Sequence, residues 1–114
     1  MPFVEGESDG LLNSTTPVTV VAAPVVANTR RIVRGLTIFN ADTASVTLTV
    51  RVNNNGTIRR IAGAVSLAAN ATFKLQDYTA LVVLDSSLKK IEAVLAGAVT
   101  TNQPEFVASF GDAS

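Results

Sequence analysis

The chain has 114 residues, of which 47% are apolar and 16% charged, and nine basic residues balance nine acidic ones. It contains no histidine, cysteine or tryptophan. The length predicts a single domain, since domains commonly hold about 100–150 residues. The composition excludes a disulfide framework, thiol-based zinc sites and catalysis by histidine or cysteine, so it favours a structural role over an enzymatic one.

The first residues of the chain, 1–16, show no periodic pattern and are rich in glycine, serine and threonine. Four apolar residues lie among them: Phe3, Val4, Leu11 and Leu12. We expect a flexible N-terminal arm at 1–16 ahead of one domain at 17–114. A disordered tail does not need apolar residues, so the arm should dock on its own domain or on a neighbour. No signal peptide or membrane span is recognisable, which predicts a protein made without export and not placed in a membrane.

Short β-branched runs separated by turn residues fill the rest of the chain. We predict strands at 18–23, 32–39, 45–53, 57–67, 72–75, 81–84, 88–96 and 105–110. The clearest is 45–53, where apolar and polar residues alternate, and Asn55-Gly56 after it predicts a tight hairpin. An interruption near Gly63 indicates a bulge. The stretch 88–96 also fits a helix, although its pattern favours a strand.

These elements predict an all-β fold, a single β-sandwich or jelly roll of about 7–8 short antiparallel strands with an extended N-terminal arm. Both faces of 32–39 carry apolar residues, so this strand should be central. The pattern leaves a jelly-roll strand order and an immunoglobulin-like one equally open.

Charge is distributed unevenly along the chain. Residues 1–29 carry three acids and no base, 30–74 carry seven bases and one acid, and 75–114 carry five acids and two bases. Solvated strand faces explain this segregation, and so do complementary patches between neighbouring subunits. Nucleic-acid binding is the weakest of the three explanations, because the net charge is zero and aromatic residues make up only 5% of the chain.

Few residues offer catalytic or metal chemistry. Asp77 and Asp85 flank an apolar run and form the best carboxylate pair, but turn acids are the simpler interpretation. Asp85-Ser86-Ser87 with Asp77 offers oxygen ligands to Ca²⁺ without the spacing of a calcium loop. Asp42 fits an Asx-type turn, and Tyr78, the only tyrosine, fits packing better than sugar stacking. We therefore expect no catalytic residue, no metal site and no cofactor.

Four stretches together follow a recognisable pattern. They are RRIVRGLTIFNADTA at 30–44, VTLTVR at 46–51, VSLAAN at 65–70 and IEAVLAG at 91–97. The pattern, a strand, an Asn-x-Asp-Thr turn, a Thr/Val strand, a Leu-Ala-Ala turn and an Ile-Glu-Ala strand, resembles small β-sandwich virion proteins of tailed bacteriophages. The resemblance extends over roughly 17–110 and is carried by structural motifs rather than catalytic ones.

The resemblance implies a non-enzymatic virion protein, a capsid decoration or cement subunit that stabilises the shell through its arm and its sandwich edges. Such proteins are often trimeric, so a homotrimer bound to the major capsid protein or another virion protein is expected, in the virion after synthesis in the host cytoplasm. The alternatives are a phage neck or tail component and a carbohydrate- or surface-binding module.

Partner contacts are expected from the apolar residues of the arm and from the first arginines of the basic segment. These residues are Phe3, Val4, Leu11, Leu12, Arg30, Arg31 and Arg34. Because the arm lies outside the predicted domain, deleting 1–16 should abolish attachment without unfolding that domain.

Overall fold

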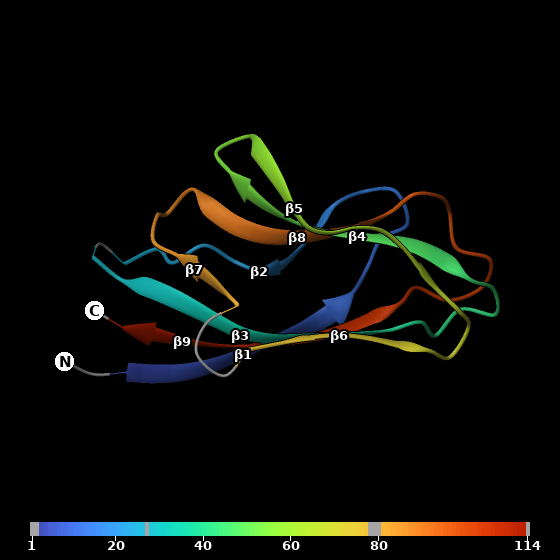
Figure 1. The fold of residues 1–114 in the computed structure, drawn as a ribbon, viewed down its shortest axis with the longest axis horizontal. Coiled ribbons are helices and arrows are strands. Elements are labelled where there is room, and N and C mark those ends of the chain that lie inside the picture. The colour runs from blue at the N-terminus through green and yellow to red at the C-terminus, as the bar shows by residue number, and fades with distance from the viewer. Residues whose placement is uncertain (1–2, 27, 78–80, 114) are drawn as a thin grey trace.

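The structure, a computed structural model, describes residues 3–26, 28–77 and 81–113. Within these ranges the chain forms nine β-strands and no helix, and hence no helix that could cross a membrane (Figure 1). The strands are β1 (Phe3–Leu11), β2 (Val18–Val21), β3 (Arg30–Phe39), β4 (Val46–Asn54), β5 (Thr57–Leu67), β6 (Thr72–Gln76), β7 (Val82–Leu84), β8 (Lys89–Leu95) and β9 (Glu105–Ala113). The predicted all-β fold is confirmed, and the ambiguous stretch 88–96 contains strand β8.

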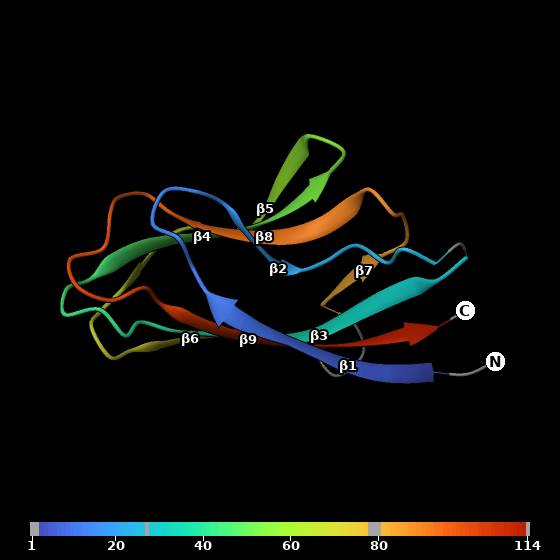
Figure 2. The ribbon, with the colours of Figure 1, turned by 180° about the vertical axis from the view of Figure 1, so that it is seen from behind.

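The strands form two antiparallel sheets, which the ribbon shows as two layers (Figures 1 and 2). One sheet has the order β1-β9-β3-β6, with β7 paired to the other half of β3; the second has the order β2-β8-β4-β5. With β7 set aside, the first strand pairs with the last, the second with the last but one, β3 with β6 and β4 with β5. This rolled-up pairing is the jelly-roll order, which the sequence left open.

The core lies between the two sheets and consists of the inward-facing residues of both. Its fully buried large side chains include Val33 and Ile38 of β3, Leu48 and Val50 of β4, and Ile91 of β8. Burial of each such side chain contributes about 1.5–3 kcal/mol to stability. Strand β3 is central, as predicted, because it pairs with β9 on one side and with β6 and β7 on the other.

Local sequence explains the β4–β5 hairpin. Apolar residues at every second position of β4 put one face of the strand into the core. Asn55 and Gly56 have φ angles of 52° and 93°, as a tight hairpin turn with left-handed residues requires. The register between β4 and β5 then shifts twice, and Ala64 has a φ of 52°, so the predicted bulge near Gly63 is confirmed.

The N-terminal segment is extended, as expected, but it is not a free arm. Residues 3–11 form β1, which pairs with β9 along its whole length without a shift in register. Gly6 and Gly10 leave room for two aromatic rings of β9: a Cβ at Gly6 would lie 2.6 Å from the Phe110 ring, and one at Gly10 3.1 Å from the Phe106 ring. The segment therefore packs on its own domain. A search for apolar periodicity does not find this strand, because glycine and serine form most of its inner face.

The loops between β1 and β2, β3 and β4, β5 and β6, and β8 and β9 gather at the end of the sandwich opposite the two termini (Figure 1). The buried Asn40 joins the β3–β4 loop to the end of β5, since its side-chain amide donates hydrogen bonds to the carbonyls of Ala44 and Leu67. Ser14 and Gln103 join the β1–β2 and β8–β9 loops through a backbone-to-side-chain bond of 2.9 Å and a side-chain bond of 3.1 Å.

Asp42 fixes this end of the molecule. Its carboxylate, 2% exposed, accepts backbone hydrogen bonds from its neighbour Thr43 and from Thr100, Thr101 and Asn102 of the β8–β9 loop, at 2.8 to 3.2 Å. These bonds, the one from Thr100 foremost, outweigh the effect of burial and lower the pKa of Asp42 from 3.8 to about 2. The predicted Asx-type turn is formed by Asn40, whose side-chain oxygen accepts a hydrogen bond from the N–H of Asp42, and the Asp42 side chain instead joins two loops that are far apart in the sequence.

Candidate assembly surface

Strand β1 forms one free edge of its sheet and contains most of the N-terminal residues predicted to contact a partner. Val4 and Leu11 are exposed by 62% and 58%, so both are open to a partner. Phe3 is the first residue of β1, but its side chain lies outside the described part of the structure. Leu12 is only 1% exposed and belongs to the protein's own core, so its prediction as a partner contact is corrected.

The outward face of β1 carries an acidic stripe, which consists of Glu5, Glu7 and Asp9. All three are exposed and alternate with the inward-facing glycine and serine residues of the strand. Residues two apart on a strand lie about 6.6–6.8 Å from each other, so the stripe is a regular row of negative charges along the edge. Sequence analysis included these acids in the charge count but predicted no strand here. Their strict alternation with small residues was the pattern that could have indicated a strand.

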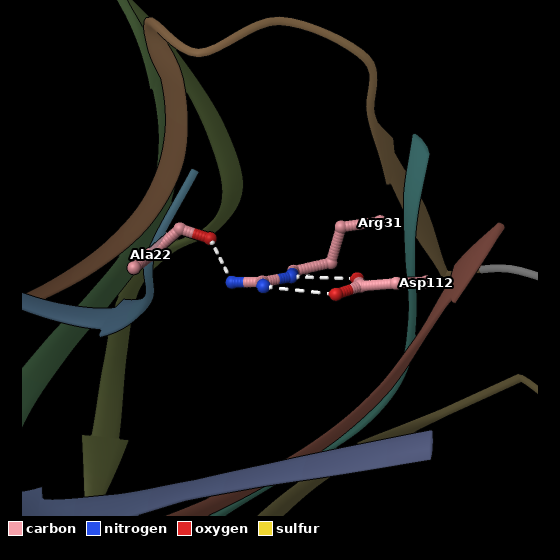
Figure 3. Close-up of polar contacts among 3 residues, drawn as sticks. All are labelled: Ala22, Arg31 and Asp112. Atoms are coloured by element: carbon pink, nitrogen blue, oxygen red, sulfur yellow. Dashed lines mark hydrogen bonds and ion pairs between the residues drawn. The ribbon is translucent and has the colours of Figure 1, made fainter. Parts of the chain in front are cut away.

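The predicted arginines lie in three different environments. Arg30 is exposed at the start of β3, while Arg34 is half-buried and lines a groove on the outer face of the sheet. Arg31 points between the two sheets, where its guanidinium forms two hydrogen bonds of 2.8 and 3.0 Å with Asp112 and one of 2.8 Å with the carbonyl of Ala22 (Figure 3). Arg31 thus ties β3 to β9 and to the end of β2.

Replacement of Arg31 by glutamine is expected to lower the free energy of unfolding by about 1–3 kcal/mol. The variant loses the bidentate ion pair with Asp112, in which the two side chains are 17% and 27% exposed. It also loses the cation–π contact of the guanidinium, which lies 4.2 Å from the centroid of the Phe110 ring. Chemical denaturation followed by circular dichroism measures this. The matched control is Arg30→Gln, which should leave stability unchanged; equal effects of both changes would contradict the assigned role of Arg31.

The groove beside Arg34 has a volume of about 360 Å³ and crosses the outer face of the β9-β3-β6 part of the sheet. Its polar lining includes Thr37, Lys74, Gln76 and Ser109, and Gly35 lies among them. The register brings Lys74 of β6 opposite Thr37, and Thr37 opposite Val107, which in turn is opposite Asp9. Charge on this face therefore changes from acidic at β1 to basic at β6, which sequence reasoning did not predict.

Glu92 is the other buried acid with a shifted pKa, and its environment is structural. Burial alone would raise its pKa, but hydrogen bonds from Asn53, Arg51 and Lys90 outweigh that effect and keep the pKa below its ordinary value. Its carboxylate lies 3.1 Å from Arg51 Nε and 3.4 Å from Lys90 Nζ. The three side chains thus form an ion-pair group that stabilises the β4–β8 pairing.

The two acids considered for chemistry, Asp77 and Asp85, both lie in exposed positions. Asp85 is exposed and lies 3.8 Å from Lys89, and Asp77 is exposed at the end of β6, where its backbone N–H donates to the carbonyl of Arg34. Within those ranges, no group of three or more acidic residues is close enough to hold a metal ion. Tyr78, considered for sugar stacking, lies outside the described residues.

No protein-family model matches the sequence, and none of the curated proteins compared with it matches. Among solved structures, a chain of the cyanophage Pam1 capsid asymmetric unit has a TM-score of 0.50 and 19% identity, over 97% of this chain and 82% of that one. A chain of desmodium yellow mottle tymovirus has a TM-score of 0.56 and 5% identity, over 97% of this chain and 85% of that one. A chain of the IBDV viral particle has a TM-score of 0.51 and 15% identity, over 96% of this chain but only 30% of that one. At these identities the likeness is one of fold.

Proposed function

We propose that this chain is a non-enzymatic structural subunit of a virus particle, and more narrowly a decoration or cement subunit on the capsid of a tailed bacteriophage. The observation that carries the proposal is the fold, a jelly roll that is similar over 97% of this chain to a chain of a cyanophage capsid asymmetric unit. A composition without histidine or cysteine supports a structural role.

Attachment to the shell would use the exposed side chains along β1 and at the start of β3. Val4, Leu11 and Arg30 remain partner contacts in this proposal, together with Phe3. The partner is the major capsid protein or another virion protein, and the subunit acts as a homotrimer in the virion after synthesis in the host cytoplasm. Three-fold symmetry turns one weak contact into three simultaneous ones, which raises the avidity for a shell with matching symmetry.

The mass of the purified protein in solution, by light scattering after size exclusion, tests the assembly. A trimer of about three chain masses supports a cement subunit, whereas a monomer contradicts the trimer. Co-sedimentation with shells of the encoding phage that lack this protein then tests attachment. Binding at a saturating, symmetric stoichiometry supports the proposal, and failure to sediment with shells or with any other part of the virion would refute it.

A second candidate is a subunit that builds the shell itself. The specific observation in its favour is the similarity in size to the tymovirus chain, of which this chain covers 85%. Negative-stain electron microscopy of the purified protein at high concentration separates the two. Closed particles formed by this chain alone favour the shell-building role, and discrete trimers favour decoration.

A further inference from the structure

The free edge of β1 differs from every other strand edge in the described ranges. It runs for nine residues in unbroken register with β9 and contains no proline. The side chain of Ser8 donates a hydrogen bond to the carbonyl of Val20, which ties the inner face of β1 to the second sheet. The edge is therefore regularly paired on its inner side, and its outer side offers backbone groups to another strand.

The remaining edges are short or irregular. Strand β2 has four residues and a register shift, β6 has five and β7 three. Strand β5 is long, but it carries the two register shifts and the left-handed Ala64. Short edge strands and bulges are two of the features by which sheets resist the addition of further strands, and charged side chains are a third, which β1 has in Glu5, Glu7 and Asp9. Among the edge strands in the described ranges, only β1 is both long and free of bulges.

The acidic stripe determines which strand can be added. If two copies of β1 paired antiparallel about Glu7, then Glu7 would face its own copy and Glu5 would face Asp9. Registers displaced by two residues still place two acids directly opposite each other, and like charges in that position are destabilising. The stripe therefore disfavours the pairing of β1 with itself, whereas a strand with basic residues at every second position would meet an opposite charge at each step.

This chain does not supply such a strand. No run in its sequence has lysine or arginine at three alternate positions, and the nearest approach, Arg30 and Arg34 in β3, lies in a strand that is already paired on both sides. Because no such segment lies within these 114 residues, we assign the occupant to a different protein. Leu11, 58% exposed and in line with the acidic stripe, offers an apolar contact at one end of the edge.

We infer that the edge of β1 is a strand-addition site for an extended segment of another protein that carries lysine or arginine at alternate positions. Backbone hydrogen bonds would provide much of the affinity, and the row Glu5, Glu7, Asp9 would select the basic segment and set its register. The site is independent of the proposed function; only the identification of the partner as a virion protein rests on that proposal.

The test uses the whole purified chain and a short synthetic peptide with lysine at three alternate positions and threonine or valine between them. Amide NMR at low ionic strength should show shift changes and slowed hydrogen exchange confined to residues 3–11. The triple variant Glu5→Gln/Glu7→Gln/Asp9→Asn should weaken binding roughly tenfold, since each facing charge pair contributes a modest part of the affinity. Glu105→Gln, a charge change on the same face but on β9, is the matched control and should retain binding.

Two further peptides distinguish strand addition from simple charge attraction. The same peptide with N-methylated backbone amides keeps its charges but cannot donate hydrogen bonds to a strand edge, so it should not bind. A version with glutamate in place of lysine should not bind either. Equal binding of the methylated peptide, shifts at another edge, or no binding of the parent peptide would overturn the inference.

The outcomes for this site and for the proposed function can be told apart. If the peptide adds to β1 but the protein ignores shells, the site is real and the proposed role is wrong. If the protein binds shells but the peptide does not add to β1, the proposed role stands and the strand-addition site is wrong.

Discussion

Removal of residues 1–16 is expected to leave a chain that is largely unfolded at room temperature. The deletion removes the whole edge strand β1 and also Leu12, which is 1% exposed in the core. Truncation of one buried leucine costs about 2–5 kcal/mol, and a domain of this size is stable by only about 5–15 kcal/mol. The deletion also exposes the rings of Phe106 and Phe110 and frees the edge of β9, so aggregation should accompany unfolding.

Urea denaturation followed by circular dichroism measures the effect. Leu11→Ser is the matched control: it changes an apolar residue in the same strand that is 58% exposed, and it should change stability by no more than about 0.5 kcal/mol. If the shortened chain unfolded at the same urea concentration as the full chain, β1 and Leu12 would not be part of the folded domain.

This expectation replaces the one drawn from the sequence, in which loss of residues 1–16 leaves the domain folded. Since Leu12 lies in the core, a deletion cannot separate attachment from folding. Substitutions of exposed residues on β1, such as Val4 and Leu11, are the appropriate tests of attachment, because they leave the strand and the core intact.

Replacement of Asp42 by asparagine is expected to lower the thermal unfolding midpoint by roughly 5–10 °C, on the scale by which lost charged hydrogen bonds shift the midpoint of a small domain. One carboxylate oxygen accepts bonds from Thr43, Thr101 and Asn102, and the other accepts from Thr100. An asparagine amide keeps one oxygen but turns an NH₂ group toward the N–H of Thr100, so two donors meet. The loss of charge weakens the remaining bonds.

The lowered pKa of Asp42 makes the same site sensitive to acid. The ionised form is favoured in the folded state, so its contribution to stability is present above pH 3.8 and is lost as the pH falls toward about 2. The native protein should therefore lose more thermal stability between pH 4 and pH 2 than the Asp42→Asn variant does. Differential scanning calorimetry across this range measures both effects. The matched control is Asp85→Asn: Asp85 is exposed, so this variant should lose as much thermal stability between pH 4 and pH 2 as the native protein. If Asp42→Asn lost as much as the native protein too, the loop contacts of Asp42 would be unimportant.

The hairpin from Val46 to Leu67 was determined by the sequence itself. Its alternation of apolar and polar residues and the Asn55-Gly56 turn act between neighbours in the chain, so short-range periodicity and turn chemistry predict them directly. The same reasoning predicted the central position of β3 and the strand at β8. The sequence also singled out Val4 and Leu11, and the structure leaves both exposed; their role as partner contacts stays a prediction.

Only the tertiary structure decided which strands share a sheet and where the N-terminal segment goes. The inner face of β1 is mainly glycine and serine, and the rings of Phe106 and Phe110, about a hundred residues away, pack where a side chain at Gly6 or Gly10 would crowd them. Asp42 likewise finds most of its partners in the loop at 100–102. Such contacts join distant parts of the chain, and their energy depends on burial and on shape that no local pattern records. The jelly-roll order and the open acidic edge follow from those contacts.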